Sequence, residues 1–325
     1  MLASKTRTLI RLLKHLARIP VLEEEVRSMR RDMAAALSSR GVRGNGDQEP
    51  RSSASATSRT CFEAFLRASP KENFLRVSLN GSTLWIPVET LRTMVHCLSV
   101  SPDGGIDACV ELDHLRWMMR HLDGGGTFLD VGAATGATTL PVACHLGSTV
   151  RIVAYEPARA ARELLGATID RNRISGVVVR PVAVSERAGT AQFREYFQDS
   201  TGQTPFLPEA SSIVANLMPQ APHSTFDVPV VTLDEDAAPL IGGKPIVCKI
   251  DVEGFEAFVL RGAEKLLSGG SVYLSIDIHA DPFGDGKRST ESDVRQILSK
   301  HGYSFERMNH VLLCTPGSQV PRSDA

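Results

Sequence analysis

The chain has 325 residues, of which 42% are hydrophobic and 22% are charged, and this composition excludes a wholly disordered or fibrous protein. Its formal net charge of -1 lacks the positive excess that nucleic-acid binding requires, so no nucleic-acid partner is expected. No apolar run reaches the roughly 18 residues of a membrane span, and the six cysteines include no CxxC pair. These features favour a cytoplasmic protein with reduced cysteines.

Residues 2–37 are predicted to form an amphipathic helix, because their apolar side chains recur every three or four positions. The spacing leaves heptad register near Pro20, so coiled-coil-like pairing into a homo-oligomer is only one of its uses. Eight Lys and Arg residues against four acidic ones also suit contact with an anionic membrane surface, which would place the protein peripherally at a membrane. The same helix could dock on the rest of the protein or remain solvated.

Residues 38–60 are rich in Ser, Gly, Arg and Thr, which predicts a flexible, disordered linker. Residues 61–126 are expected to lead into the main domain. Within them, two β-type runs on either side of the Asn-Gly pair at 80–81 predict a hairpin over 74–88. A helix is predicted over 111–122, where the apolar spacing is helical and a run of three glycines follows.

From residue 127 to residue 317, buried strands alternate with helices, which predicts an α/β domain with a parallel sheet and right-handed crossovers. The predicted strands are 127–132, 149–156, 177–184, 245–251, 271–279 and a final pair, 302–308 and 310–316, joined at Asn309, with helices at 137–146 and 158–173. The long connection between the third and fourth strands is expected to be an insertion with two strands of its own, at 190–197 and 226–233. A flexible tail, 318–325, follows.

A glycine-bounded turn follows the first strand of this domain and opens the next helix. Asp130 lies in the strand, while Gly132 and Gly136 permit a sharp turn at its carboxyl end, where open α/β sheets bind ligands. The second strand ends at Glu156, whose carboxylate is placed to accept hydrogen bonds from a ribose diol. Ala134 stands where a dinucleotide site has its middle glycine, so the turn favours S-adenosylmethionine over a nicotinamide dinucleotide.

Two charged residues lie two positions apart at the end of an otherwise apolar strand. Lys249 and Asp251 should share one face of a sheet that is covered on both sides, where charges are paired or used. A structural ion pair between Lys249 and Asp277 of the neighbouring strand is one interpretation. The favoured interpretation is a functional role for Asp251 at the ligand-binding edge of the sheet.

A set of motifs occurs in one order between Glu111 and Phe305. It comprises Asp-Val-Gly-Ala-x-x-Gly at 130–136, Glu156-Pro157, Asn172, Ala183-Val184-Ser185, Gly189, Ser211-Ser212, Thr232 to Glu235, Lys-Ile-Asp-Val-Glu-Gly at 249–254, Glu256, and Leu260 to Ala263. With this set the chain resembles the FkbM-type S-adenosylmethionine-dependent methyltransferases. The resemblance implies a Rossmann-like class I methyltransferase fold, whose seven-stranded sheet has an antiparallel final strand, and it implies O-methylation.

The chain departs from the family pattern at two positions. The family turn usually has Asn where this chain has Ala134, which affects a contact to the methionine part of the cofactor. The fifth strand of the family usually ends in Glu-x-His, where this chain has Asp277 and His279. This second change shortens a carboxylate by one methylene and keeps its charge.

Methyl transfer to a hydroxyl requires the reacting atoms in line and a group that takes the hydroxyl proton. We expect His279 to be this base in preference to Asp251, because an unperturbed imidazole titrates near neutrality. Lys249 would orient Asp251 or stabilise the developing alkoxide. The expected contacts are Glu253, Asp277 and Ser212 with the substrate, and Asp130, Gly132, Ala133, Gly136, Glu156 and Ser185 with the cofactor.

The predicted function is S-adenosylmethionine-dependent O-methylation of a hydroxyl on a sugar, a glycan or a polyketide-type secondary metabolite. Asp251, Asp277 and His279 could together hold Mg²⁺, but two carboxylates at strand ends are a weak signal, so no metal ligand is predicted. One alternative is a non-catalytic or assembly protein that retains the methyltransferase fold. A nicotinamide-dependent oxidoreductase is a weaker one, because the GxGxxG pattern is missing.

Overall fold

The structure is a computed structural model that describes residues 74–94, 97–100, 106–196, 223–240, 244–269, 271–279 and 291–317. The predicted N-terminal helix, the linker and the C-terminal tail lie outside these ranges. The chain divides into two units, one up to Cys109 and one from Val110, so the helix predicted at 111–122 belongs to the second unit. None of the helices in the described ranges is long and apolar enough to cross a bilayer.

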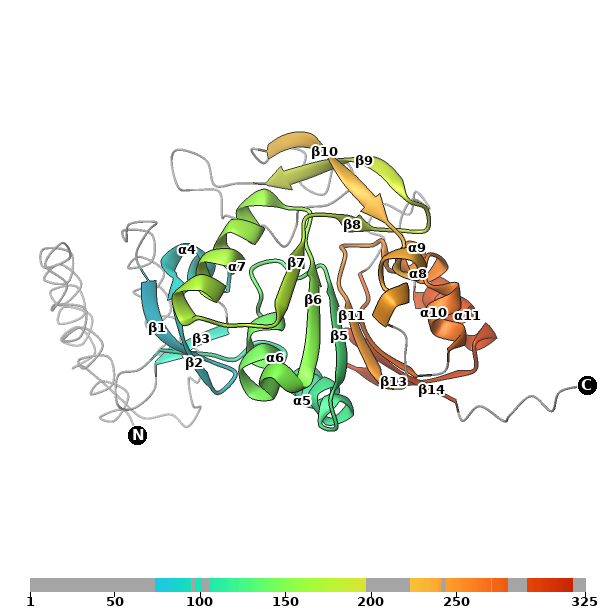
Figure 1. Ribbon diagram of the computed structural model, residues 1–325, viewed down its shortest axis with the longest axis horizontal. Helices are drawn as coiled ribbons and strands as arrows, with labels where there is room; N and C mark the ends of the chain where they lie inside the picture. The colour runs from blue at the N-terminus through green and yellow to red at the C-terminus, as the bar shows by residue number, and fades with distance from the viewer. Residues whose placement is uncertain are drawn as a thin grey trace, which may run out of the picture. The chain divides into compact units, whose positions relative to one another are not determined.

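The first unit contains a small sheet with the strand order β2-β1-β4-β3 (Figure 1). Its elements are β1 (Phe74–Leu79), β2 (Ser82–Pro87), α4 (Val88–Thr93), β3 (Leu98–Val100) and β4 (Ile106–Ala108). β1 and β2 pair antiparallel around Asn80 and Gly81, whose φ angles are 47° and 89°. A two-residue turn with positive φ at both positions matches the twist of the strands that it joins, and the predicted hairpin is confirmed.

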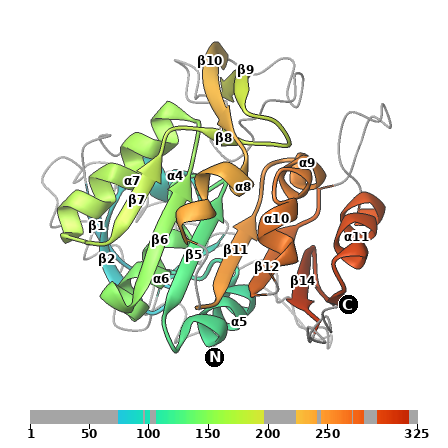
Figure 2. The same cartoon turned by 45° about the vertical axis from the view of Figure 1, so that its right-hand side comes forward.

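The second unit is built around a seven-stranded sheet with the order β13-β14-β12-β11-β5-β6-β7 (Figure 2). Its strands are β5 (Gly126–Val131), β6 (Val150–Tyr155), β7 (Val177–Arg180), β11 (Ile246–Ile250), β12 (Val272–Asp277), β13 (Tyr303–Met308) and β14 (Val311–Pro316). β14 is antiparallel to both of its neighbours, and the pairs from β12 to β7 are parallel. The predicted class I methyltransferase sheet, with its antiparallel final strand, is confirmed.

Helices cover both faces of this sheet, as the apolar runs of its central strands require (Figures 1 and 2). α5 (Leu112–Leu122) and α6 (Thr139–Leu146) enclose one apolar core with the sheet, and α9 (Glu256–Arg261), α10 (Glu264–Ser268) and α11 (Glu291–Lys300) enclose the other. The remaining helical elements are α7 (Arg159–Asn172), α8 (Leu233–Asp236), η3 (Gly147–Thr149) and η5 (Ala238–Leu240). The central strands are thus buried on both sides.

A separate three-stranded sheet of the order β8-β10-β9 belongs to the insertion. It consists of β8 (Ala183–Val184), β9 (Gly189–Tyr196) and β10 (His223–Val231), so the two strands predicted there are confirmed. The single strand predicted over 177–184 is wrong, because β7 ends at Arg180 and β8 pairs with β10 instead. Pro181 lies at the break, and its lack of an N–H group prevents it from continuing the hydrogen-bonded ladder.

Candidate active site

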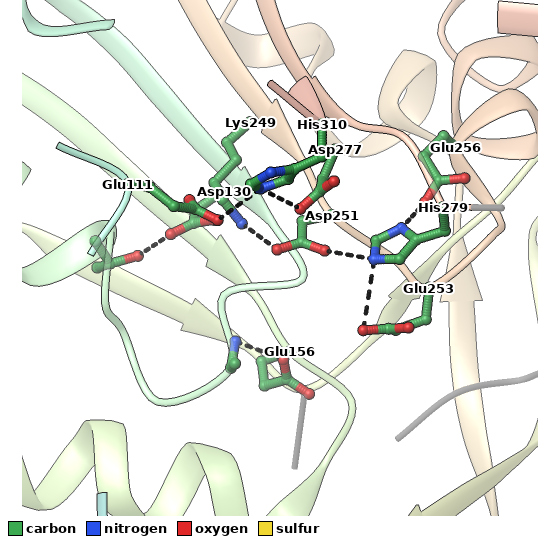
Figure 3. Close-up of polar contacts among 12 residues, drawn as sticks. Glu111, Asp130, Glu156, Lys249, Asp251, Glu253, Glu256, Asp277, His279 and His310 are labelled. Atoms are coloured by element: carbon green, nitrogen blue, oxygen red, sulfur yellow. Dashed lines mark hydrogen bonds and ion pairs between the residues drawn. The ribbon is translucent and has the colours of Figure 1, made fainter. Parts of the chain in front are cut away.

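Charged side chains gather at the carboxyl ends of four neighbouring strands of the large sheet (Figure 3). Asp130 lies near the end of β5, Glu156 follows β6, Asp251 follows β11, and Asp277 ends β12. The strands β6, β5, β11 and β12 are adjacent and parallel, so residues far apart in the sequence meet at one edge. This edge is where open α/β sheets bind ligands.

Close packing leaves no room for a side chain at the two glycines of the turn after β5. Gly132 has a φ of 83°, and a Cβ atom there would lie 1.8 Å from the carbonyl oxygen of Asp251. Gly136 has a φ of 92°, and a Cβ there would lie 2.5 Å from a methyl carbon of Leu165. Ala133 is buried, and its N–H donates to the carbonyl of Tyr155. The turn is therefore shaped by close contact with the rest of the second unit.

Asp130 is fully buried at this edge. Its Oδ2 accepts a hydrogen bond of 2.6 Å from the hydroxyl of Thr139, while its Oδ1 has no hydrogen-bond partner among the described residues. Burial raises the pKa of Asp130 to about 6, although the ammonium of Lys249 and the Thr139 hydroxyl act in the opposite direction. Sequence reasoning missed Thr139, and its position as the first residue of the helix after the turn was the available signal.

Glu156 is 5% exposed, and backbone N–H groups hold both of its carboxylate oxygens. The N–H of Ala134 donates to Oε2 and the N–H of Ala158 donates to Oε1, each over 2.7 Å. Burial raises the pKa of Glu156 to about 7 against these two hydrogen bonds. Ala134 has a φ of 46°, a left-handed conformation that Asn and Gly adopt more readily than Ala.

Lys249 forms an ion pair with Asp251, with 2.8 Å between Nζ and Oδ2. The alternative of a pair with Asp277 is not what the structure contains, since the contact of Asp277 is with His310. The residues before and after Lys249 point into the core that α9 and α10 cover, so Lys249 itself points to the opposite face, beside Asp130. The pair thus lies on the face of the sheet that α5 covers.

Both members of this ion pair are charged at neutral pH. Burial lowers the pKa of Lys249, but the carboxylates of Asp251, Asp130 and Glu111 outweigh burial and raise it overall. Burial raises the pKa of Asp251, but the ammonium of Lys249 and the ring of His279 outweigh burial and lower it overall. Asp251 is therefore a weak base in this setting.

His279 is surrounded by carboxylates from three positions after β11 (Figure 3). Its Nδ1 lies 2.8 Å from Oε1 of Glu256, which also accepts a hydrogen bond from the N–H of Gly254. Its Nε2 lies 3.7 Å from Oδ1 of Asp251 and 3.6 Å from Oε1 of Glu253. Burial lowers the pKa of His279, but these acceptors outweigh burial and raise the pKa to about 10.

At neutral pH the ring of His279 therefore carries a proton on both nitrogens, and an imidazolium has no lone pair with which to accept another. This setting does not favour the expected role of His279 as the base. Its surroundings suit the imidazolium as a fixed cation among three carboxylates.

A second group of close side chains lies at the same edge, and of its members sequence reasoning predicted Asp277 but missed Glu111 and His310. His310 Nε2 lies 3.5 Å from Oδ2 of Asp277 and 3.9 Å from Oε1 of Glu111. Glu111 precedes α5 with a left-handed φ of 47°, and His310 follows the turn at Asn309, where the antiparallel β14 begins at this edge. The signal available for His310 was its position directly before the antiparallel strand, which begins at this edge.

The two groups differ from the set considered for Mg²⁺. The donor atoms of Asp251, Glu253 and His279 lie within 4.8 Å of one another, whereas Asp277 groups with Glu111 and His310. Asp251, Asp277 and His279 are thus not brought together as one set.

Of the two serines predicted to contact ligands, Ser185 lies within the described residues and Ser212 does not. Ser185 follows β8, where its N–H donates to the carbonyl of Val231 and its own carbonyl lies close to Gly262 after α9. The assignment of Ser185 to the cofactor stays a prediction. Ser212 lies outside the described residues, so its assignment to the substrate stays a prediction.

The model of the methyltransferase FkbM domain matches residues 130–305, which is more than half of the chain. A search of the curated proteins gave no match.

Among solved structures, the methyltransferase FkbM from Methylobacillus flagellatus KT is 20% identical with a TM-score of 0.37, and the match covers 59% of this chain and 43% of that chain. The fibrillarin of Aeropyrum pernix, solved with natively bound S-adenosyl-L-methionine, is 14% identical with a TM-score of 0.34, over 59% of this chain and 66% of the other. The precorrin-6y C5,15-methyltransferase from Geobacter metallireducens GS-15 is 11% identical with a TM-score of 0.36, and the match covers 65% of this chain and 90% of that chain. These identities and scores are too low to assign a function to the chain.

Proposed function

The chain belongs to the FkbM methyltransferase family, and from this we propose that it transfers a methyl group from S-adenosylmethionine to a hydroxyl of a sugar, a glycan or a polyketide-type metabolite. The family establishes methyl transfer in general. The choice of a hydroxyl acceptor rests on the chemistry of the site, where carboxylates and a protonated imidazole offer hydrogen-bond partners to hydroxyl groups. The acceptor would approach Glu253 and Asp277 at the carboxyl edge of the sheet.

The observation that carries the proposal is the fit of this edge to a cationic cofactor with a ribose. Asp130 has a buried Oδ1 without a hydrogen-bond partner among the described residues, which can accept a hydrogen bond from an ammonium group. Glu156 directly follows the next strand and lies against the glycine-bounded turn, as a ribose-binding carboxylate does. When bound, S-adenosylmethionine supplies a methyl group on a positively charged sulfur.

Carboxylates outnumber cationic groups around this site. Those in contact with one another or with the shared cations are Glu111, Asp130, Asp251, Glu253, Glu256 and Asp277, against the Lys249 ammonium and the His279 imidazolium. A net negative site attracts a cationic ligand, and it repels the pyrophosphate of a nicotinamide dinucleotide. Charge therefore favours S-adenosylmethionine over the dinucleotide.

Within this site, the chain's own residues have separable roles. Asp130 and Glu156 hold the cofactor, and Gly132 brings the turn against the backbone of Asp251. Lys249 fixes the Asp251 carboxylate by an ion pair, and Glu256 fixes the ring of His279 by a hydrogen bond. Alignment of the reacting atoms supplies much of the acceleration of such a displacement. The possible oligomer or membrane contact through residues 2–37, and the cytoplasmic location, stay predictions.

The proposal is tested first by calorimetric titration of the full chain with S-adenosylmethionine and, separately, with NAD. We expect the first ligand to bind and the second not to bind. Glu156→Ala should weaken S-adenosylmethionine binding roughly 10- to 100-fold, because a charged acceptor of ribose hydrogen bonds is lost. Asp234→Ala is the matched control, since Asp234 also accepts two backbone hydrogen bonds, from Lys265 and Leu266, outside the site.

A second assay follows transfer of a radiolabelled methyl group to a panel of methyl glycosides and hydroxylated macrolactones. Incorporation into either class that requires Glu156 supports the O-methyltransferase. Tight NAD binding without S-adenosylmethionine binding would replace the proposal by a nicotinamide-dependent oxidoreductase. A folded chain that binds neither cofactor would replace it by a non-catalytic or assembly protein.

A further inference from the structure

Methylation of a hydroxyl group releases a proton, and the described residues at the site offer few groups that can accept it. His279 already carries protons on both nitrogens, with Nδ1 donating to Glu256. Asp251 is held by the ammonium of Lys249 at 2.8 Å. Glu256 is 1% exposed and its Oε1 contacts both the ring of His279 and the N–H of Gly254, so an incoming hydroxyl does not reach it.

Glu253 differs from these neighbours in how it is held. No hydrogen bond to its carboxylate exists among the described residues, and its contact is the 3.6 Å approach of Oε1 to Nε2 of His279. Its side chain is 25% exposed, so a ligand and water can both reach it. Asp277 and Glu111 are the other carboxylates in the described part of this edge that no hydrogen bond holds, but both face His310, and Asp277 is only 14% exposed.

The backbone at Glu253 is strained. Its φ is 54°, in the left-handed region, and Gly254 follows with a φ of 99°. Glycine adopts such angles freely, whereas a residue such as Glu adopts them only at an energetic cost. Strain of this kind persists where the surrounding structure enforces it, and it concentrates at functional sites. Here the turn directs the Glu253 carboxylate toward His279 (Figure 3).

On the basis of the O-methyltransferase function proposed above, we propose that Glu253 accepts the proton of the acceptor hydroxyl, with His279 as the positioning residue. The O–H bond of the hydroxyl breaks as its oxygen gains the methyl group, while the bond between that methyl carbon and the sulfur of S-adenosylmethionine breaks and its electron pair stays on sulfur. The electron pair of the O–H bond stays on the oxygen, and the proton passes to an oxygen of the Glu253 carboxylate. Exchange with water through the exposed part of the side chain then returns Glu253 to its ionised form.

The electrostatic surroundings of Glu253 support this role. Burial raises its pKa, the imidazolium of His279 lowers it, and the carboxylates of Asp251, Glu256 and Asp277 raise it, with a result of about 7. A base with a pKa near the working pH combines a useful ionised fraction with a useful affinity for the proton. His279, fixed by Glu256, keeps the Glu253 carboxylate in place and holds a positive charge beside it.

The first measurement needs no acceptor. Carbon-13 spectra of the full chain, labelled at glutamate side-chain carboxyls and recorded with S-adenosylhomocysteine bound, are compared between wild type and Glu253→Gln. The signal missing in the variant should titrate near pH 7 in the wild type. The ring signal of His279 should titrate at a lower pH in Glu253→Gln, because one carboxylate is lost. Titration of Glu253 near its ordinary pKa would overturn the proposal.

The second measurement uses the methyl glycoside or macrolactone that gains label in the assay above. Glu253→Gln should lower kcat roughly 100-fold or more and remove the acidic limb of the pH profile, while the affinity for S-adenosylmethionine stays within about twofold. Glu253→Asp should recover part of kcat. Glu264→Gln on α10 is the control with unchanged activity, since it removes an exposed carboxylate outside the site.

The outcomes separate the two proposals. A wild type that methylates its acceptor while Glu253→Gln keeps kcat within about threefold overturns the role of Glu253 and leaves the function standing. Loss of the acidic limb in Asp277→Asn, and not in Glu253→Gln, would also overturn it. If the wild type labels no acceptor, the O-methyltransferase function fails, and the carboxyl titration alone decides whether Glu253 is the near-neutral acid at this edge.

Discussion

Single residues in this site are charged or neutral because of neighbours that the fold supplies. Lys249 is 7% exposed, yet it remains an ammonium because Asp251 and Asp130 lie beside it. A buried ion pair adds little net stability over an apolar pair, but removal of one partner leaves the other charge buried without compensation. The Lys249 ammonium therefore matters most for the carboxylates that it neutralises.

Lys249→Met should lower the free energy of unfolding by about 3–5 kcal/mol near neutral pH, measured by urea denaturation. The double variant Lys249→Met/Asp251→Asn should recover part of this loss, because both charges of the pair are then gone. A loss below about 1 kcal/mol in the single variant would mean that the ammonium does not compensate buried carboxylates.

At the scale of elements, the close approach of β5 and β11 depends on the absence of a side chain at Gly132. The space that a Cβ would occupy there is filled by the backbone of Asp251, which cannot move aside as a flexible side chain would. Gly176, before β7, has nearly the same φ of 81°, but nothing lies within 4 Å of the position of its Cβ. The two glycines thus separate the effect of φ from the effect of crowding.

Gly176→Ala should destabilise the chain by only about 1–2 kcal/mol, which is the cost of a left-handed alanine. Gly132→Ala should cost clearly more and should also weaken S-adenosylmethionine binding, because the turn and the Asp251 segment must separate. Urea denaturation and calorimetry of the two variants provide the comparison. Equal losses of stability would show that the contact with Asp251 yields easily.

At the scale of the whole molecule, several groups at the sheet edge have a pKa raised by folding. Glu156 has a pKa of about 7 in the folded chain against an ordinary 4.5, so the unfolded chain loses its proton first as pH rises. The penalty from burial is absent below about pH 4.5 and grows until about pH 7. His279 acts in the same direction, since its stabilising charge is present below its ordinary pKa of 6.5 and is lost as pH rises towards about 10.

The free energy of unfolding should therefore fall as pH rises from about 5 to about 8. Glu156→Gln should lose less over this interval, by on the order of 1–3 kcal/mol, because the amide does not ionise. Urea denaturation of both proteins at several pH values measures the slopes. Identical slopes would contradict the raised pKa of Glu156. Asp251 has the opposite sign, because its lowered pKa gives a stability that is lost only on acidification below its ordinary 3.8.

The sequence by itself determined the elements and the family. Positive φ at Asn80, Gly81 and Asn309 follows from local turn chemistry, and alternating buried strands and helices follow from apolar periodicity. The run at 249–254 indicated the methyltransferase family that the domain match then showed. Where the sequence prediction was wrong, at 177–184, a proline inside an apolar run separated two strands that pair with different sheets.

Only the tertiary structure decided which charges meet and which protons they hold. Lys249 pairs with Asp251 and not with Asp277, and Glu111, Thr139 and His310 join the site from elements distant in sequence. The ordinary pKa of a histidine is 6.5, and the three carboxylates around His279 in the fold raise its pKa to about 10. A pKa depends on burial and on charges within a few ångströms, and both are properties of packing that residue type and spacing do not contain.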